Sequence, residues 1–204
     1  MINVIGSGSW GISFSSYLNT IGFDVIVHHR NSIRSKKIIK SYQHPNLSGS
    51  RISKKIKFTD NFKCMDFNNL TIFALPTSAL SCFSKINYSI NSKFILLSKG
   101  FHPETGLLPT EYITQQFNIN IKNLSVLSGP NHAEELFLSK PTATVISSTN
   151  RDFSKSVQNM FSSKVLRLYT SEDIVGVQVG AAIKNVIAIA SGLSHGLGFG
   201  DNAQ

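Results

Sequence analysis

Cysteine is scarce in this chain of 204 residues, which contains only Cys64 and Cys82. The two form no CxxC pair and fall far below the cysteine density of a small secreted domain, so we expect reduced thiols in a cytoplasmic protein. The first residues show neither a basic segment nor a small-residue cleavage site, and no signal peptide is expected. Internal repeats and low-complexity tracts are also missing.

Signatures of metal and hydrolytic sites are absent as well. The sequence contains no HxxxH or HExxH motif, and His102, His132 and His195 have no partner at a metal-binding spacing. There is no Walker-type loop and no Ser-His-Asp signature. These absences predict no metal site and argue against hydrolases.

No apolar run of membrane-spanning length is free of polar residues. The longest candidate, residues 174–193, is interrupted by Gln178, Lys184 and Asn185, so we expect no membrane span.

Acidic residues are few: the sequence has 11 Asp and Glu compared with 20 Lys and Arg, which gives a net charge of +9. The basic residues are scattered, and their densest region (Arg30–Lys57) has Tyr42 as its only aromatic residue. Interleaved aromatics would indicate nucleic-acid binding, which we therefore do not expect. A basic surface that favours phosphorylated small molecules is the better interpretation.

What is present begins at residue 2, where an apolar run leads into Gly6-x-Gly8-x-x-Gly11 and then into an amphipathic segment. A buried strand, a tight turn and a helix N-terminus make a dinucleotide site in this order. Gly6 allows the turn, Gly8 lets the backbone approach a pyrophosphate, and Gly11 lets the helix pack closely. The alternative is an ordinary glycine-rich turn.

The residues after the second expected strand, 24–27, bear on the choice of cofactor. An NAD site usually has an Asp or Glu near this point to bind the ribose hydroxyls, but here the chain reads His28-His29-Arg30-Asn31. A guanidinium suits a 2′-phosphate, so NADPH is favoured and NADH stays possible. The alternative is that Arg30 faces solvent and that the cofactor site has little selectivity at the ribose.

Alternating strands and helices predict the fold class. Ser32–Lys57 reads as a helix followed by a long surface loop. Further strands are expected at 70–75, 94–97, 124–127, 142–146 and 165–168, with helices over 104–117 and 151–161. This pattern predicts a Rossmann-type doubly wound α/β sheet in residues 1–169. Residues 170–204 would begin a second, all-helical substrate domain, with N-cap and first-turn residues at 170–173 and a long apolar helix from Ile174 to about Ser191.

Three places could carry chemistry. Lys184 shares a helix face with small residues, so it would lie in a recess where desolvation lowers its pKa, as a general acid or base requires. The members of that face are Gly180, Ala181, Lys184, Ala188 and Ser191. Lys99 follows a strand end, and Gly129-Pro130-Asn131 begins a helix at another strand end, where backbone N–H groups could bind oxygen atoms. The alternative for Lys184 is a lysine that extends its ammonium group to the surface, and for Lys99 it is a solvent-exposed loop lysine. The alternative for Gly129-Pro130-Asn131 is a simple N-cap.

Taken together, these segments resemble the bacterial NAD(P)-dependent glycerol-3-phosphate dehydrogenase family, in family order and over the whole chain. The pieces that carry the resemblance are Gly6-Ser7-Gly8-Ser9-Trp10-Gly11, Leu75-Pro76-Thr77, Ser98-Lys99-Gly100 with Glu104-Thr105-Gly106, Leu127-Ser128-Gly129-Pro130, Pro141-Thr142-Ala143, and 176–190 continuing to Gly198-Phe199-Gly200. The resemblance implies reversible reduction of dihydroxyacetone phosphate to sn-glycerol 3-phosphate for glycerophospholipid synthesis.

The resemblance also implies roles for single residues. Those that would contact the cofactor are Ser9, Trp10, Arg30, Lys99 and Ala133, beside the three glycines. Lys99 would also bind substrate, together with Gly129, Asn131 and Lys184. Lys184 would be the proton acceptor in oxidation and the proton donor in reduction. Asn131 stands where the family more often has Ser or Thr, and an amide can still donate and accept hydrogen bonds.

Family members continue past this point with helices that carry an acidic residue and an Asn/Arg pair for the glycerol phosphate. We therefore expect either a fragment or a truncated product, and a homodimer of the full-length form stays open. Two other functions are kept as alternatives. One is a non-catalytic remnant that binds NADPH, and the other is a different two-domain reductase, such as a ketopantoate or hydroxyacid reductase.

Overall fold

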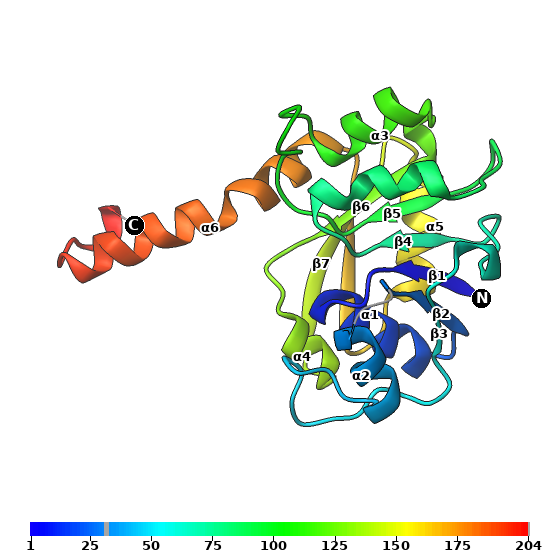
Figure 1. Ribbon diagram of the computed structural model, residues 1–204. Coiled ribbons are helices and arrows are strands. Elements are labelled where there is room, and N and C mark those ends of the chain that lie inside the picture. Colours follow the sequence, from blue (N-terminus) through cyan, green and yellow to red (C-terminus); the bar gives the residue numbers. More distant parts are fainter. Residues whose placement is uncertain (31–32, 204) are drawn as a thin grey trace.

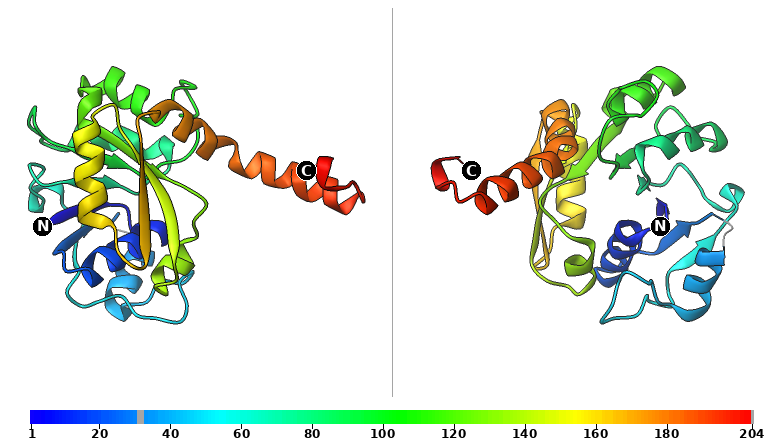
Figure 2. Two further views of the ribbon diagram at one scale, coloured as in Figure 1. Left: turned by 180° about the vertical axis from the view of Figure 1, so that it is seen from behind. Right: turned by 60° about the vertical axis from the view of Figure 1, so that its left-hand side comes forward.

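The computed structural model describes residues 1–30 and 33–203, and Asn31, Ser32 and Gln204 lie outside the described residues. The described chain forms one sheet with helices on both faces and a long helix that leads away from it (Figures 1 and 2). The strands are β1 (Ile2–Ile5), β2 (Val25–His28), β3 (Lys57–Thr59), β4 (Thr71–Phe73), β5 (Phe94–Leu96), β6 (Leu124–Ser128), β7 (Thr142–Ser147) and β8 (Leu166–Ser171). The helices are α1 (Ser9–Thr20), α2 (Ile33–Ser41), α3 (Pro109–Phe117), α4 (Ala133–Phe137), α5 (Arg151–Phe161) and α6 (Ile174–Gly196), with 3₁₀ turns at Phe62–Cys64, Thr77–Lys85, Ile121–Asn123 and Asp201–Ala203.

The strand order in the described sheet is β3-β2-β1-β4-β5-β6-β7-β8. Strands β1 to β6 are parallel, β7 runs antiparallel to β6, and β8 is parallel to β7. Chain order reverses between β1 and β4, which is the switch point where ligands bind in open α/β sheets. The expected doubly wound α/β fold is confirmed, as a mixed sheet.

The structure corrects two expectations. Strand β3 begins at Lys57, which the sequence pattern placed at the end of a surface loop. It is a three-residue edge strand with little burial, so it has no clear apolar pattern. The helix expected over 104–117 begins only at Pro109, a residue well suited to the first helical position. The preceding residues instead form a turn in which Gly106 has a φ of +68°.

Two apolar layers hold the sheet between its helices. On one face α1 and α5 pack together, and the Phe14 and Phe161 rings meet edge to face with centroids 5.9 Å apart. The buried Tyr17 hydroxyl of α1 donates a hydrogen bond to the Phe161 carbonyl oxygen at 2.5 Å. On the other face Phe83, from the 77–85 turns, stacks on Phe73 of β4 at 4.1 Å.

Helix α6 is attached to the sheet domain by its first turns. Asp173 is its N-cap, because the Gly176 N–H donates to Asp173 Oδ1 at 2.7 Å. The sequence placed the cap and the first-turn acids within residues 170–173, but Thr170 and Ser171 belong to β8 and the first turn contains no acid. The buried Gln178 accepts from the Thr110 N–H at 3.1 Å and donates from Nε2 to Thr110 Oγ1 at 2.9 Å and to the Ile174 carbonyl at 2.8 Å. Beyond these turns the helix projects away from the sheet (Figure 1).

The predicted domain boundary between residues 169 and 170 falls inside β8 and stays a prediction. Helix α6 is long and apolar enough to cross a membrane by length and composition, with a mean hydropathy of 1.6 over its best window. Core helices of globular proteins can have the same length and hydropathy, so these two properties do not distinguish a membrane-spanning helix from a core helix. Most of that window is exposed, including Val186, Ile189 and Leu193.

We predict that Gln178→Ala lowers the free energy of unfolding by about 2 kcal/mol, because it leaves the buried Thr110 N–H without its acceptor. Urea denaturation followed by circular dichroism measures this loss. The matched control is Gln116→Ala on α3, which removes an exposed glutamine and should change stability by less than about 0.5 kcal/mol. Equal losses in the two variants would contradict an anchoring role for Gln178.

Candidate functional site

The turn between β1 and α1 uses its three glycines in different ways. Gly6 has a φ of +118°, and a Cβ there would overlap the Ala74 carbonyl oxygen of the neighbouring β4 loop. A Cβ on Gly11 would overlap the Gly6 carbonyl oxygen. A Cβ on Gly8 would meet no heavy atom within 4 Å. Gly6 and Gly11 are therefore required by packing, whereas Gly8 leaves open space in which a ligand can approach the backbone.

Loops from four neighbouring strands meet at this edge of the sheet. The Gly6 N–H donates to the His28 carbonyl oxygen at 3.0 Å, which ties the turn to the end of β2. Ser98 Oγ donates to the Leu75 carbonyl oxygen at 2.6 Å and so joins the loops after β5 and β4. Lys99 Nζ lies 6.0 Å from the centroid of the Trp10 ring. The predicted cofactor residues Trp10 and Lys99 are thus neighbours.

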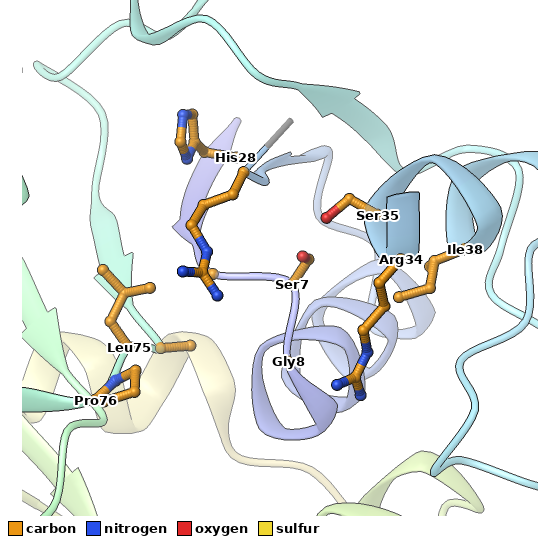
Figure 3. A pocket seen from close by; sticks show the side chains of 11 residues that line it. Ser7, Gly8, His28, Arg34, Ser35, Ile38, Leu75 and Pro76 are labelled. Atoms are coloured by element: carbon orange, nitrogen blue, oxygen red, sulfur yellow. The ribbon is translucent and has the colours of Figure 1, made fainter. Parts of the chain in front are cut away.

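A cavity of about 260 Å³ lies beside the glycine turn (Figure 3). Its lining residues are Gly6, Ser7, Gly8, His28, Arg30, Arg34, Ser35, Ile38, Ala74, Leu75 and Pro76. Gly6, Gly8 and Arg30, which the sequence predicts to contact the cofactor, line this cavity. His28, Arg34 and Ile38 also line it and were not predicted to, although the spacing from 34 to 38 on a helix indicates that the last two share a face.

His28 contributes a flat ring to this cavity. The imidazole stacks on Phe62 with ring centroids 3.8 Å apart, and burial lowers the pKa of His28 below its ordinary value of 6.5. The ring is therefore neutral at pH 7. Positive charge in the cavity comes from Arg30 and Arg34, which are both exposed.

A second cavity, of about 300 Å³, lies where α6 leaves the sheet. Its lining residues are Ser128, Gly129, Pro130, Val145, Gly176, Val177, Gly180, Ala181 and Lys184. The predicted recess around Lys184 is therefore present, with Gly180 and Ala181 beside the lysine. Ala188 and Ser191, which the sequence placed on the same face, lie farther along α6 and are not lining residues. Gly129 also lines this cavity.

The positive charge of Lys184 acts on Lys99. The pKa of Lys99 lies below its ordinary value of 10.5, first because its ammonium group is partly buried and second because the positive charge of Lys184 is nearby. Two close ammonium groups repel each other, and an anion between or beside them would relieve that repulsion.

Asn131 is buried with both amide atoms unpaired. Its side chain is 8% exposed, and neither Oδ1 nor Nδ2 has a hydrogen-bond partner in the described part of the chain. The same is true of Trp10 Nε1 and Thr144 Oγ1. Leaving such groups unpaired costs free energy, so these atoms fit a ligand that would complete their hydrogen bonds.

Gly129 has little room for a side chain, since a Cβ there would lie 3.0 Å from both Cα and Oγ1 of Thr144. Ala133, at the start of α4, is fixed against α1 because its carbonyl oxygen accepts from Ser13 Oγ at 2.7 Å. Ala133 and Ser9 line neither of the two cavities. Their cofactor roles stay predictions, as do the roles of the other site residues.

Within the described residues, no group of three or more His, Cys, Asp or Glu side chains could hold a metal ion. The polar groups described above are the backbone amides of the glycine turn, Arg30 and Arg34 in the first cavity, Lys184 in the second, Lys99 beside Trp10, and the unpaired Asn131 amide. These groups are hydrogen-bond donors and cations, and they suit phosphate and carbonyl oxygens.

Comparisons with known proteins agree with this arrangement. Residues 1–154 match the family described as NAD-dependent glycerol-3-phosphate dehydrogenase N-terminus, and residues 173–204 match the corresponding C-terminus. Over 211 residues the chain is 35% identical to glycerol-3-phosphate dehydrogenase [NAD(P)+] of Macrococcus caseolyticus, covering 100% of this chain and 63% of the relative. The enzyme of the same name from Halothermothrix orenii is 36% identical, with 100% and 60% covered. The chain thus spans about three fifths of the length of these curated relatives.

Solved structures show the same fold. A glycerol-3-phosphate dehydrogenase from Plasmodium falciparum superposes with a TM-score of 0.86 at 23% identity, covering 99% of this chain and 60% of that chain. The enzyme from Coxiella burnetii superposes with a TM-score of 0.84 at 24% identity, covering 98% and 62%. With the family match extending over 154 of the 204 residues and the glycine turn, Lys99 and Lys184 meeting at one sheet edge, this chain belongs to the NAD-dependent glycerol-3-phosphate dehydrogenase family.

Proposed function

We propose that the chain serves the reversible NAD(P)H-dependent reduction of dihydroxyacetone phosphate to sn-glycerol 3-phosphate, which supplies glycerophospholipid synthesis. The observation that carries the proposal is the electrostatic interaction between two cations, Lys99 and Lys184. Asn131, which directly follows the cavity residues Gly129 and Pro130, adds a buried amide without a partner. A phosphorylated ketone brings an anion for the lysines and oxygen atoms for the amide. The names of the relatives support this choice of substrate.

The dinucleotide would lie across the edge of the sheet at the switch between β1 and β4. Gly8 leaves its backbone accessible, and the free N–H groups at the start of α1 suit a pyrophosphate. The cavity beside Arg30 would take the adenosine end, with Leu75 and Pro76 as apolar walls. When bound, the reduced nicotinamide supplies the hydride for the substrate carbonyl carbon.

Lys184 would handle the proton. As hydride reaches the carbonyl carbon, negative charge develops on the carbonyl oxygen, and the Lys184 ammonium group stabilises that charge and then donates its proton. In the oxidation direction the neutral amine accepts the hydroxyl proton. Lys99 would hold the phosphate and contact the cofactor, while Gly129 and Asn131 would bind the substrate.

The cofactor is expected to be NADPH in preference to NADH, because Arg30 follows β2 where NAD sites usually have an acidic residue. The two reduced cysteines are consistent with a cytoplasmic location, which we also propose. A homodimer of the full-length form stays a prediction.

A second candidate function is a protein that binds NADPH without turning over a substrate. The glycine turn and the cavity of Arg30 would serve such binding without the lysines. A reductase of another small carbonyl compound is the third alternative.

Purified residues 1–204 separate the three functions. The experiment measures NADPH binding by fluorescence and NADPH oxidation with dihydroxyacetone phosphate, ketopantoate and a 2-keto acid. We expect binding, and oxidation with dihydroxyacetone phosphate alone. Binding without any oxidation would favour the non-catalytic function, and oxidation with another carbonyl compound alone would favour the third alternative.

We predict that Lys184→Ala lowers kcat by about 10²–10⁴-fold, as expected for loss of a general acid, and leaves the Kd for NADPH within about twofold of the parent value. Kinetics should be measured in residues 1–204 and in their fusion to the remaining C-terminal part of the Macrococcus caseolyticus relative. Lys155→Ala, an exposed lysine on α5, is the matched control. Unchanged turnover in Lys184→Ala would exclude the assigned role.

We predict that Arg30→Ala weakens NADPH binding roughly tenfold, or about 1.4 kcal/mol, because a charge-assisted contact to the 2′-phosphate is lost. NADH binding should change by less than about twofold. Fluorescence titration with both dinucleotides checks this, with Arg51→Ala as the control, since Arg51 is exposed and not a lining residue of the cavity. Equal losses for the two dinucleotides would argue against a 2′-phosphate contact.

A further inference from the structure

A second guanidinium shares the adenosine-end cavity with Arg30. Arg34 lies on the first turn of α2, and its side chain extends beside the turn that carries Ser7 and Gly8 (Figure 3). Both arginines line the cavity together with Ser7. They come from different elements, since Arg30 follows β2 and Arg34 belongs to α2.

Arg34 and Ile38 lie on the same face of α2. Ile38, which is 2% exposed, lies one turn beyond Arg34 and lines the same cavity, so the helix presents positions 34 and 38 to it. Lys37 lines a neighbouring cavity, formed with residues 43–50, which Arg34 and Ile38 line as well. Arg34 therefore lies between the two cavities, whereas Lys37 is not among the lining residues of the cavity of Arg30.

Neither arginine forms an ion pair with a described residue. The sequence contains no Asp or Glu between Asp24 and Asp60. Among the described residues, the ion pair that forms joins Arg151 to Glu172, far along the sequence from both arginines. Arg30 and Arg34 are exposed, so their charge remains available to an anion from outside.

The size of the cavity limits what it can hold. At about 260 Å³ it is smaller than the roughly 300–1,000 Å³ that pockets for whole ligands occupy, so it fits one end of a dinucleotide. Apolar walls from Ile38, Leu75 and Pro76 suit a base. Two guanidiniums beside the glycine turn suit a phosphate on the adjoining ribose.

We propose that Arg30 and Arg34 together bind the 2′-phosphate of NADPH, so that Arg34 is a specificity-determining residue of the cofactor site. The proposal rests on the dinucleotide binding proposed above and adds the residue that sets the choice between the two dinucleotides. A phosphate monoester carries a charge of about −1.5 to −2 at pH 7, more than one guanidinium offsets. A planar guanidinium can also donate two parallel hydrogen bonds to it, which an ammonium group cannot do.

The experiment uses residues 1–204 carrying Arg34→Ala, with Lys37→Ala as the matched control on the same helix. Isothermal titration measures the Kd for NADPH, NADH, 2′,5′-ADP and 5′-AMP, so that the last pair isolates the 2′-phosphate from the nicotinamide half. We expect Arg34→Ala to weaken NADPH and 2′,5′-ADP roughly tenfold, to leave NADH and 5′-AMP within about twofold, and to reduce the salt dependence of NADPH binding. Lys37→Ala should leave all four constants within about twofold.

Arg34→Lys, which keeps the charge but not the planar fork, should lie between the parent chain and Arg34→Ala. Circular dichroism and thermal melting check that each variant is folded. An equal loss for NADPH and NADH would place Arg34 at the pyrophosphate or base and overturn the inference, as would no loss for either. If the parent chain binds NADPH and NADH with equal Kd, the inference fails while dinucleotide binding stands. If it binds neither, the proposed function fails as well.

Discussion

The close approach of two backbones at the glycine turn is the constraint on which the rest of the site depends. Gly6 lies so near the Ala74 carbonyl that no side chain fits, and Gly11 lies equally near Gly6 itself. These contacts bring the start of α1 over the switch between β1 and β4, where the sheet leaves a crevice. A side chain on Gly8 would meet no other part of the protein, so packing does not require a glycine there. A pyrophosphate bound close to the backbone would require one.

Uncompensated charge is the second property of this sheet edge. Burial and the charge of Lys184 lower the pKa of Lys99, neither Arg30 nor Arg34 forms an ion pair with a described residue, and Asn131 keeps a buried amide unpaired. The partly buried Lys99 charge and the unpaired Asn131 amide each cost the folded chain some stability. A ligand that carries phosphate and carbonyl oxygens would offset both costs and would also pair with the exposed arginines. Gln178 links this chemistry to the architecture, because its hydrogen bonds to Thr110 fix the turns of α6 that lead to Lys184.

Much of this arrangement could be predicted from local patterns. The apolar run before Gly6, the helical spacing after it and the strand ends at Leu75 and Ser98 are short-range signals, and they gave the sheet and the edge at which ligands bind. The errors have physical reasons. Strand β3 is short and half exposed, so it lacks an apolar pattern, and Pro109 starts α3 later than the periodicity indicates. Gln178 appeared in the sequence as an interruption of an apolar run, because its partner Thr110 is 68 residues away.

The sequence by itself determined the family, the order of strands and helices, and which residues could bind a dinucleotide, because glycine spacing and hydrophobic periodicity act over a few residues. The tertiary structure decided which of those residues meet. It placed Lys99 beside Trp10 and close enough to Lys184 to lower the pKa of Lys99, and it placed Arg34 in the cavity of Arg30. These contacts join residues from separate elements, whose relative positions depend on how the sheet twists and how helices pack on it, and no local pattern encodes that.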